Sequence, residues 1–310
     1  MEDAQTVQLG DKLYVGGGVV RTPGKYREVA KLYTYTLSTA TWDVMSTPTY
    51  YFALITYCSE LVLVGGREYV SQWNQGPITN KLWTLGEYDQ WTDTLPPMLN
   101  EVCHVSAVEY VCYIIVAGGV SDGKDSNSVE VYDGNCWTEV QCLPNPCFSM
   151  KSTVLNGIWY LTGGERQGKA VYCASLDSLI MSSHQSNIWK RATDVPYGYS
   201  SLAVFKHRLI AIGGRVNSPS SAIHAYSQRT KCWVHVADMP IELDDTCTTV
   251  LLTGELMVIG GWSTKGGDLS CVYQATLEGI HNYTDTLKHD VSKPPPVNYI
   301  GQTAAAVVVV

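Results

Sequence analysis

Phenylalanine, charge and long apolar runs are all scarce in this chain of 310 residues. It has 3 phenylalanines beside 20 tyrosines, and only 16% of its residues are charged. Its 29 acidic and 21 basic side chains give a formal net charge of −8, which disfavours a nucleic-acid binder because such proteins need Lys and Arg against phosphates. It has no apolar run of about 18 residues and no basic-then-apolar start. We therefore expect a soluble cytoplasmic protein without a signal peptide or membrane span.

The ten cysteines also lack the spacing of a metal or redox site. No two of them form Cys-x2-Cys, and most lie within apolar runs, so we interpret them as small buried thiols of a reducing compartment. Gly-x-Ser-x-Gly, His-Glu-x2-His and phosphate-binding glycine loops are absent as well. The sequence thus predicts no catalytic residue, no metal and no cofactor.

What the chain does contain is a repeat with a period near 50 residues. Each unit has a short apolar run followed by two glycines, and the first glycines of successive pairs are 45 to 53 residues apart. The pairs are Gly16-Gly17, Gly65-Gly66, Gly118-Gly119, Gly163-Gly164, Gly213-Gly214 and Gly260-Gly261. A period of this length indicates stacked structural units rather than two unrelated domains.

Tryptophans and prolines keep phase with the glycine pairs. The tryptophans are Trp42, Trp91, Trp137, Trp189 and Trp233, and a proline follows each by five to seven residues, at Pro48, Pro96, Pro144, Pro196 and Pro240. Aromatic β-rich runs lie between the glycines and the tryptophan, so each period holds four short strands. We expect glycines with positive φ that let a bulky ring approach, tryptophans packed between sheets with a bonded indole N–H, and prolines that end each fourth strand.

The double glycine, the later Tyr and Trp and this period resemble the Kelch repeat. The resemblance implies an all-β, six-bladed Kelch-type β-propeller with four-stranded antiparallel blades, because a ring of small sheets leaves only short edges. It also implies one domain over residues 1–310, with approximate repeats 1–48, 49–97, 98–146, 147–196, 197–240 and 241–310.

Two segments depart from the regular repeat. Residues 176–186 are an insertion in the fourth repeat, which we expect to be an exposed loop. The C-terminal residues 302–310 resemble the opening strand of another repeat, although residues 4–9 already look like the opening strand of the first. By analogy with Kelch propellers we expect the N- and C-terminal strands to pair and close the ring; the alternative is that the chain is cut from a longer protein.

In proteins that this chain resembles, ligands bind at the central mouth, on loops that follow the double glycines and loops that lead into the next blade. The resemblance therefore implies a partner-binding set of Tyr50, Tyr51, Arg67, Asn100, Phe148, Arg166, Tyr197, Tyr199, Arg215, Asp244 and Trp262. Tyr, Trp and Arg dominate binding hot spots, and the three arginines suit bidentate contacts with carboxylates. Kelch-like adaptors often place a further arginine upstream of the double glycine, where this chain has no basic residue.

We therefore predict a non-catalytic protein-interaction module that binds a protein or peptide at this loop face, as a monomeric domain alone or within a larger adaptor, without nucleic acid or membrane. The alternative is a propeller-type enzyme acting on a small molecule, metal-assisted or sugar-directed. His281-x3-Asp285-x3-His289 resembles the iron site of Kelch-type nitrile specifiers, but we interpret it as a solvated loop. Actin binding rests on family analogy alone. The lone His104, His207 and His224 are interpreted as strand surface or core.

Overall fold

The computed structural model describes residues 4–22, 25–28, 30–71, 74–163, 168–181, 187–264, 267–268 and 272–275. Within them the chain forms successive antiparallel sheets, each built from strands that follow one another in the sequence. Second strands such as Glu60–Val64 are apolar and buried on both faces, which lets each sheet pack against a neighbour on either side.

The sheets are numbered here in chain order. Sheet 1 consists of β1 (Gln5–Leu9), β2 (Lys12–Gly16), β5 (Lys31–Thr36) and β6 (Thr41–Ser46). Sheet 2 consists of β8 (Ala53–Tyr57), β9 (Glu60–Val64), β12 (Leu82–Leu85) and β13 (Trp91–Thr92). Sheet 3 consists of β14 (Ser106–Tyr110), β15 (Tyr113–Ala117), β18 (Val129–Tyr132) and β19 (Trp137–Glu139).

The remaining sheets follow the same order. Sheet 4 consists of β20 (Met150–Leu155), β21 (Ile158–Gly163), β22 (Val171–Ser175) and β23 (Lys190–Arg191). Sheet 5 consists of β24 (Ser201–Phe205), β25 (Arg208–Ile212), β26 (Ser220–Ser227) and β27 (Cys232–Leu243). Sheet 6, as far as it is described, consists of β28 (Cys247–Val250), β29 (Leu256–Ile259) and β32 (Val272–Ala275).

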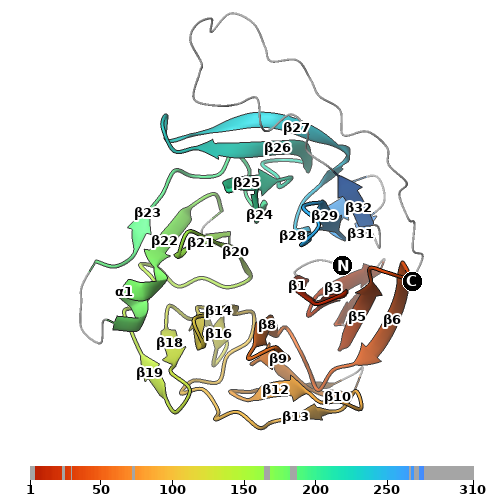
Figure 1. The fold of residues 1–310 in the computed structure, drawn as a ribbon, viewed down its shortest axis with the longest axis vertical. Helices are drawn as coiled ribbons and strands as arrows, with labels where there is room; N and C mark the ends of the chain where they lie inside the picture. The colour runs from red at the N-terminus through yellow and green to blue at the C-terminus, as the bar shows by residue number, and fades with distance from the viewer. Residues whose placement is uncertain are drawn as a thin grey trace, which may run out of the picture.

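The sheets stand around a common centre, with the first strand of each toward the middle and its last described strand outside (Figure 1). The inner strands β1, β8, β14, β20, β24 and β28 contact one another in that order, and β28 also contacts β1. A hydrophobic cluster lies between each adjacent pair of these sheets, including one that joins Leu13 and Val15 of sheet 1 to Met257 and Ile259 of sheet 6. The core is therefore divided among the interfaces between sheets.

Short accessory strands lie in the loops at one end of the sheets. They are β3 (Val19–Thr22) with β4 (Lys25–Glu28), β7 (Thr49–Tyr50) with β10 (Arg67–Ser71) and β11 (Asn74–Ile78), β16 (Val120–Ser121) with β17 (Lys124–Asp125), and β30 (Trp262–Ser263) with β31 (Gly267–Asp268). Each of these hairpins follows a glycine pair.

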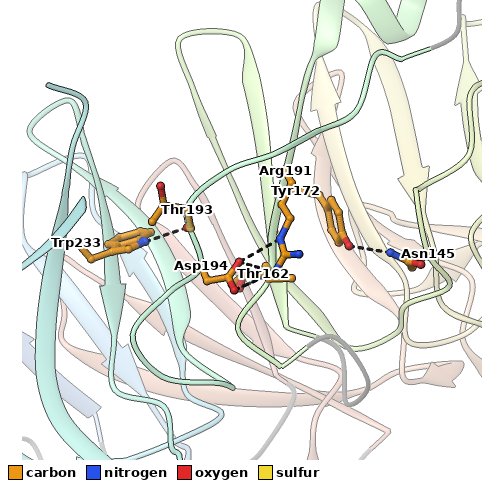
Figure 2. A network of polar contacts seen from close by, with 8 residues as sticks. Asn145, Thr162, Tyr172, Arg191, Thr193, Asp194 and Trp233 are labelled. Atoms are coloured by element: carbon orange, nitrogen blue, oxygen red, sulfur yellow. Dashed lines mark hydrogen bonds and ion pairs between the residues drawn. The ribbon is translucent and has the colours of Figure 1, made fainter. Parts of the chain in front are cut away.

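The repeated tryptophans join neighbouring sheets by a recurring hydrogen bond. In four cases the indole Nε1 donates to a backbone carbonyl at the outer edge of the preceding sheet or just beyond it, which confirms that the indole N–H finds a partner. These bonds run from Trp91 to Ser46 at 3.0 Å, Trp137 to Pro96 at 2.8 Å, Trp189 to Gln141 at 3.0 Å and Trp233 to Thr193 at 3.1 Å. Figure 2 shows the last of them beside the ion pair of Arg191 and Asp194.

Every described glycine of the pairs except Gly16 has the expected positive φ, but their close neighbours are chiefly backbone. Gly118 and Gly119 have φ of 68° and 93°, and a Cβ on either would lie 2.5 Å from a carbonyl oxygen, of Cys147 and Cys103 respectively. An aromatic ring does lie close to Gly16: a Cβ at this position would be 3.0 Å from the Phe52 ring. The pairs are therefore required where two loops cross at close range.

Three local expectations are wrong. The segment that follows β22 begins with a short helix, α1 (Leu176–Met181), because Leu176 and Leu179 are fully buried against the cluster between sheets 3 and 4. The second correction is that strand β27 continues through Pro240, which an edge strand with irregular register tolerates.

No helix in the described part of the chain is long and apolar enough to cross a bilayer.

The third correction concerns the cysteines. Of the described ones, Cys103, Cys147 and Cys247 are buried, but Cys58, Cys112, Cys136 and Cys232 are exposed. The exposed cysteines lie at or beside turns between strands. The predicted closing strand, residues 302–310, lies outside the described residues.

Candidate functional site

The two sets of loops at the accessory end are joined by short β-bridges. In each bridge a residue entering a first strand pairs with one that follows a glycine pair. The bridges are Tyr50 with Arg67, Cys103 with Val120, Gly198 with Arg215 and Asp244 with Trp262. These loops form one surface, which we call the mouth face.

A ring of residues with left-handed backbone conformation lies next to these bridges. Its members are Tyr51, His104, Ser149, Tyr199 and Asp245, with φ between 50° and 58°. Backbone hydrogen bonds link members of different sheets: His104 N to Tyr51 O, Ser149 N to His104 O, and Asp245 N to Tyr199 O, at 2.8 to 3.1 Å. Non-glycine residues rarely adopt this conformation, and functional sites are enriched in such strain. We call these five residues the mouth ring.

One arc of the mouth ring is aromatic. The Tyr51 ring stacks on His104 with centroids 3.8 Å apart, and Phe148 meets the same imidazole edge-on at 6.0 Å. The His104 Nδ1 lies 3.0 Å from the Ser149 hydroxyl. Burial lowers the pKa of His104 to about 4, with the positive charge of Arg67 acting in the same direction. The imidazole is therefore neutral near pH 7 and serves as part of a flat aromatic surface.

The opposite arc is ionic. The Arg215 guanidinium lies 4.3 Å from the Tyr199 ring centroid and 3.3 Å from the Asp244 carboxylate. Lys151, from inner strand β20, lies 3.0 Å from the Asp245 carboxylate, and both side chains are at least 85% buried because only 12% and 15% of them is exposed. This pair therefore ties sheet 4 to the loop that enters sheet 6.

A small cavity lies beneath the aromatic arc. This cavity, of about 20 Å³, is lined by residues that include Gln5, Tyr51, His104 and Lys151. The Gln5 amide closes it from sheet 1, donating to Val105 O at 3.2 Å and accepting from Leu54 N at 3.0 Å. Such a volume holds about one water molecule, whereas sites for small-molecule ligands have about 300 Å³ or more.

The predicted site residues fall into several environments. Tyr51, Phe148, Tyr199 and Arg215 lie on the two arcs. Tyr50 and Asp244 are only 2% and 1% exposed, and they contact Tyr51 and Arg215 respectively.

The other predicted residues lie in the loops around the arcs. Arg67 donates to Gly76 O within its own hairpin, and Tyr197 lies 5.8 Å from His224, ring to ring, over β26. Trp262 is half-buried in β30. The Asn100 amide is held by the buried carboxylate of Glu130 at 2.7 Å. Arg166 lies outside the described residues, as do His281, Asp285 and His289.

Sequence reasoning missed His104, Ser149 and Lys151. Their position in the sequence could have indicated the mouth-ring residues, since each comes one or two positions before an inner strand.

No group of three His, Cys, Asp or Glu side chains placed to hold a metal occurs in the described ranges. The imidazole that looked isolated in the sequence is in fact at the centre of the aromatic arc.

Comparison with known proteins agrees with this architecture. The family model for the Kelch motif matches residues 102–144 and 196–240. The chain is 27% identical over 188 residues to Kelch-like protein 23 of Homo sapiens, covering 58% of this chain and 32% of that protein. It is 25% identical over 293 residues to Kelch-like protein terF of Aspergillus terreus, covering 86% of this chain and 62% of that protein.

Two stretches of the chain therefore match the Kelch motif, and the chain is similar to Kelch-like proteins. A solved structure titled "Structure of YjhT" superposes with a TM-score of 0.70 at 13% identity, covering 89% of this chain and 95% of that one. This likeness in fold, the successive four-stranded antiparallel sheets and the Kelch motif matches together support a Kelch β-propeller. The Kelch-repeat chain spans about a third of the length of Kelch-like protein 23 and under two thirds of terF.

Proposed function

We propose that this Kelch-repeat chain is one six-bladed propeller domain with the repeat boundaries given above, and that it binds a protein or peptide partner at its mouth face without catalysing a reaction. The six-bladed ring is supported by the cyclic order of inner-strand contacts and by the cluster shared between sheets 6 and 1. In this proposal side-chain packing contributes to the seam, and the described strands of sheet 1 all come from residues 5–46. Pairing of residues 302–310 with the N-terminal blade stays a prediction.

The observation that carries the binding proposal is the mouth ring. Five loops hold strained residues in a fixed arrangement, and their side chains are Tyr, His and Ser on one arc and Tyr and Asp on the other. A rigid surface that offers aromatic rings beside an arginine is suited to a protein hot spot, because little conformational entropy is lost on binding. The 20 Å³ cavity beneath it favours surface contact over substrate enclosure.

The partner that fits this surface has both an apolar and an acidic element. The Tyr51 and Phe148 rings favour an aromatic or aliphatic side chain. Arg215 stays one-third exposed while bonded to Asp244, so a carboxylate of the partner can approach its outer edge. An adaptor role within a longer protein is consistent with the Kelch-like relatives and belongs to this proposal.

A photo-cross-linking experiment tests where the partner binds. Phe148 is replaced by p-benzoylphenylalanine in one variant, and Tyr88, which is 85% exposed on the outer turn of sheet 2, is replaced in a control. We expect a protein to cross-link to the first variant, and the cross-link to disappear when Tyr51→Ala is added. Equal cross-linking from both positions, or from position 88 alone, would contradict a site at the mouth.

A further inference from the structure

The end of the molecule opposite the mouth face carries the turns that join first to second and third to fourth strands; we call it the hairpin face. In sheet 5 the first of these turns is Lys206-His207, with φ of 47° and 61°, and Arg208 follows at the start of β25. The corresponding turns of sheets 1 to 4 are Gly10-Asp11, Cys58-Ser59, Val111-Cys112 and Asn156-Gly157. The turn of sheet 5 thus differs from the other four in having three successive basic or imidazole side chains, Lys206, His207 and Arg208.

The second turn of sheet 5 adds to the same cluster. It joins β26 to β27 and contains Arg229 and Lys231, with Lys231 N bonded to Ser227 O at 2.9 Å. The corresponding turn of sheet 2 instead contains Glu87 and Asp89. The chain as a whole has a net charge of −8, so this concentration of cations is a local feature and does not reflect overall composition.

A cavity of about 330 Å³ lies beneath these two turns. The described residues that line it include His207, Arg208 and Arg229, and none of these described residues is Asp or Glu. Buried aliphatic side chains, among them Leu155 and Leu209, form its floor. A cavity of this size with an apolar floor and a few convergent polar groups has the composition of a ligand site.

Two tyrosines complete the wall of this cavity. Tyr160 comes from β21 of sheet 4 and Tyr226 from β26 of sheet 5, so the cavity straddles both sheets. Burial raises the pKa of Tyr160, which keeps its phenol protonated as a hydrogen-bond donor. Phenol, imidazole and guanidinium groups all donate to an anionic acceptor.

The turn that carries Arg229 is fixed to sheet 4. The Thr193 hydroxyl donates to Lys231 O at 2.7 Å, and the Trp233 Nε1 donates to Thr193 O at 3.1 Å, as Figure 2 shows for the tryptophan. These bonds join the turn that carries Arg229 to the segment that follows β23. A preorganised site loses less entropy when a ligand binds.

We propose that this cavity is a binding site for an oxyanion attached to an apolar body, such as a phosphate monoester or carboxylate on an aromatic or aliphatic group. Arg208, Arg229 and His207 hold the oxyanion, with the two arginines able to form bidentate hydrogen bonds. The body of the ligand lies against the aliphatic floor and the tyrosine rings. The site is separate from the mouth face and does not depend on the function proposed there.

Isothermal titration calorimetry at low ionic strength tests this site with phenyl phosphate, inorganic phosphate and benzoate as probes. We expect saturable binding of phenyl phosphate, tighter than that of inorganic phosphate because the ring lies on the apolar floor. The double variant Arg208→Gln/Arg229→Gln is expected to weaken binding about tenfold or more. Comparison of phenyl phosphate with benzoate decides whether the site prefers a phosphoryl group or a carboxylate.

The matched control is Lys12→Gln, which removes a positive charge at the position of sheet 1 equivalent to Arg208. It should leave binding within about twofold of the wild type, and thermal unfolding should show that all variants are folded. No saturable binding of phenyl phosphate at about 10 mM, or equal binding by the double variant, overturns the proposal. Inorganic phosphate binding as tightly as phenyl phosphate overturns the role of the apolar floor.

Discussion

The two arcs of the mouth ring have the same backbone and different chemistry. Tyr51 and His104 on one arc, and Tyr199 and Asp245 on the other, share the left-handed conformation and the same place before an inner strand. On the first arc the side chains stack as rings; on the second the Tyr199 ring contacts the Arg215 guanidinium and Asp245 forms an ion pair with Lys151. The difference teaches that the repeat fixes where a side chain is presented, while the residue at each position determines what is recognised.

The arcs also differ in how their polar groups are stabilised. His104 is kept neutral by burial, whereas Lys151 and Asp245 remain buried as a pair 3.0 Å apart. A buried pair is costly to break because one charge is left without its partner. The ionic arc should therefore be the more sensitive to single substitutions, and the aromatic arc the more sensitive to pH.

The largest effect is expected for Lys151→Met. The substitution keeps the length of the side chain but leaves the Asp245 carboxylate, 15% exposed, without this cation. We expect a loss of about 3 to 5 kcal/mol in the free energy of unfolding, measured by urea denaturation. The matched variant Lys151→Met/Asp245→Asn should recover part of the loss, and a loss below about 1 kcal/mol would show that the pair is not important to the ionic arc.

Protonation of His104 is expected to lower the free energy of unfolding by up to about 3 kcal/mol. Its pKa in the folded chain is about 4, against an ordinary value of 6.5, so the unfolded chain takes up the proton first as the pH falls. The stability this group contributes is complete above about pH 6.5 and is lost as the pH falls toward 4.

His224 also has a pKa lowered to about 4 by burial, so it titrates in the same window and must be separated from His104. Urea denaturation from pH 4 to 7 should show a shallower decline for His104→Phe than for the wild type, with His224→Phe as the comparison. Identical pH dependence in His104→Phe and the wild type would contradict the burial of a neutral imidazole in the aromatic arc.

A smaller loss in the free energy of unfolding, about 1 to 2 kcal/mol, is expected for Arg215→Gln. The guanidinium is 34% exposed, so water screens its ion pair with Asp244 and replaces part of the interaction that is lost. The informative result is that Arg215→Gln loses less stability than Lys151→Met when both are measured by urea denaturation. Reversal of the two would mean that the Tyr199 and Asp244 contacts stabilise the ionic arc more than the buried pair does.

The sequence was sufficient for the repeated architecture but not for the chemistry of the mouth. Glycine pairs and tryptophans identify strand ends and sheet contacts because their physical requirements, positive φ and a large buried ring, are visible in the residue type. Helix α1 and the continuation of β27 through Pro240 were missed because tertiary packing decided them. Tyr51 and Tyr199 were predicted, but His104 and Ser149 were missed because His and Ser carry no signature of a left-handed backbone. The Lys151–Asp245 pair was missed because its two residues meet only after the sheets are arranged.

The most direct test of the central claim, that the mouth face binds the partner, is a comparison of affinity capture by three forms of the domain. These are the wild type, the mouth variant Tyr51→Ala/Arg215→Ala, and the control Tyr88→Ala on an exposed outer turn. The account predicts that a protein retained by the wild type and the control is lost from the folded mouth variant. Retention of the same protein by all three forms would contradict it.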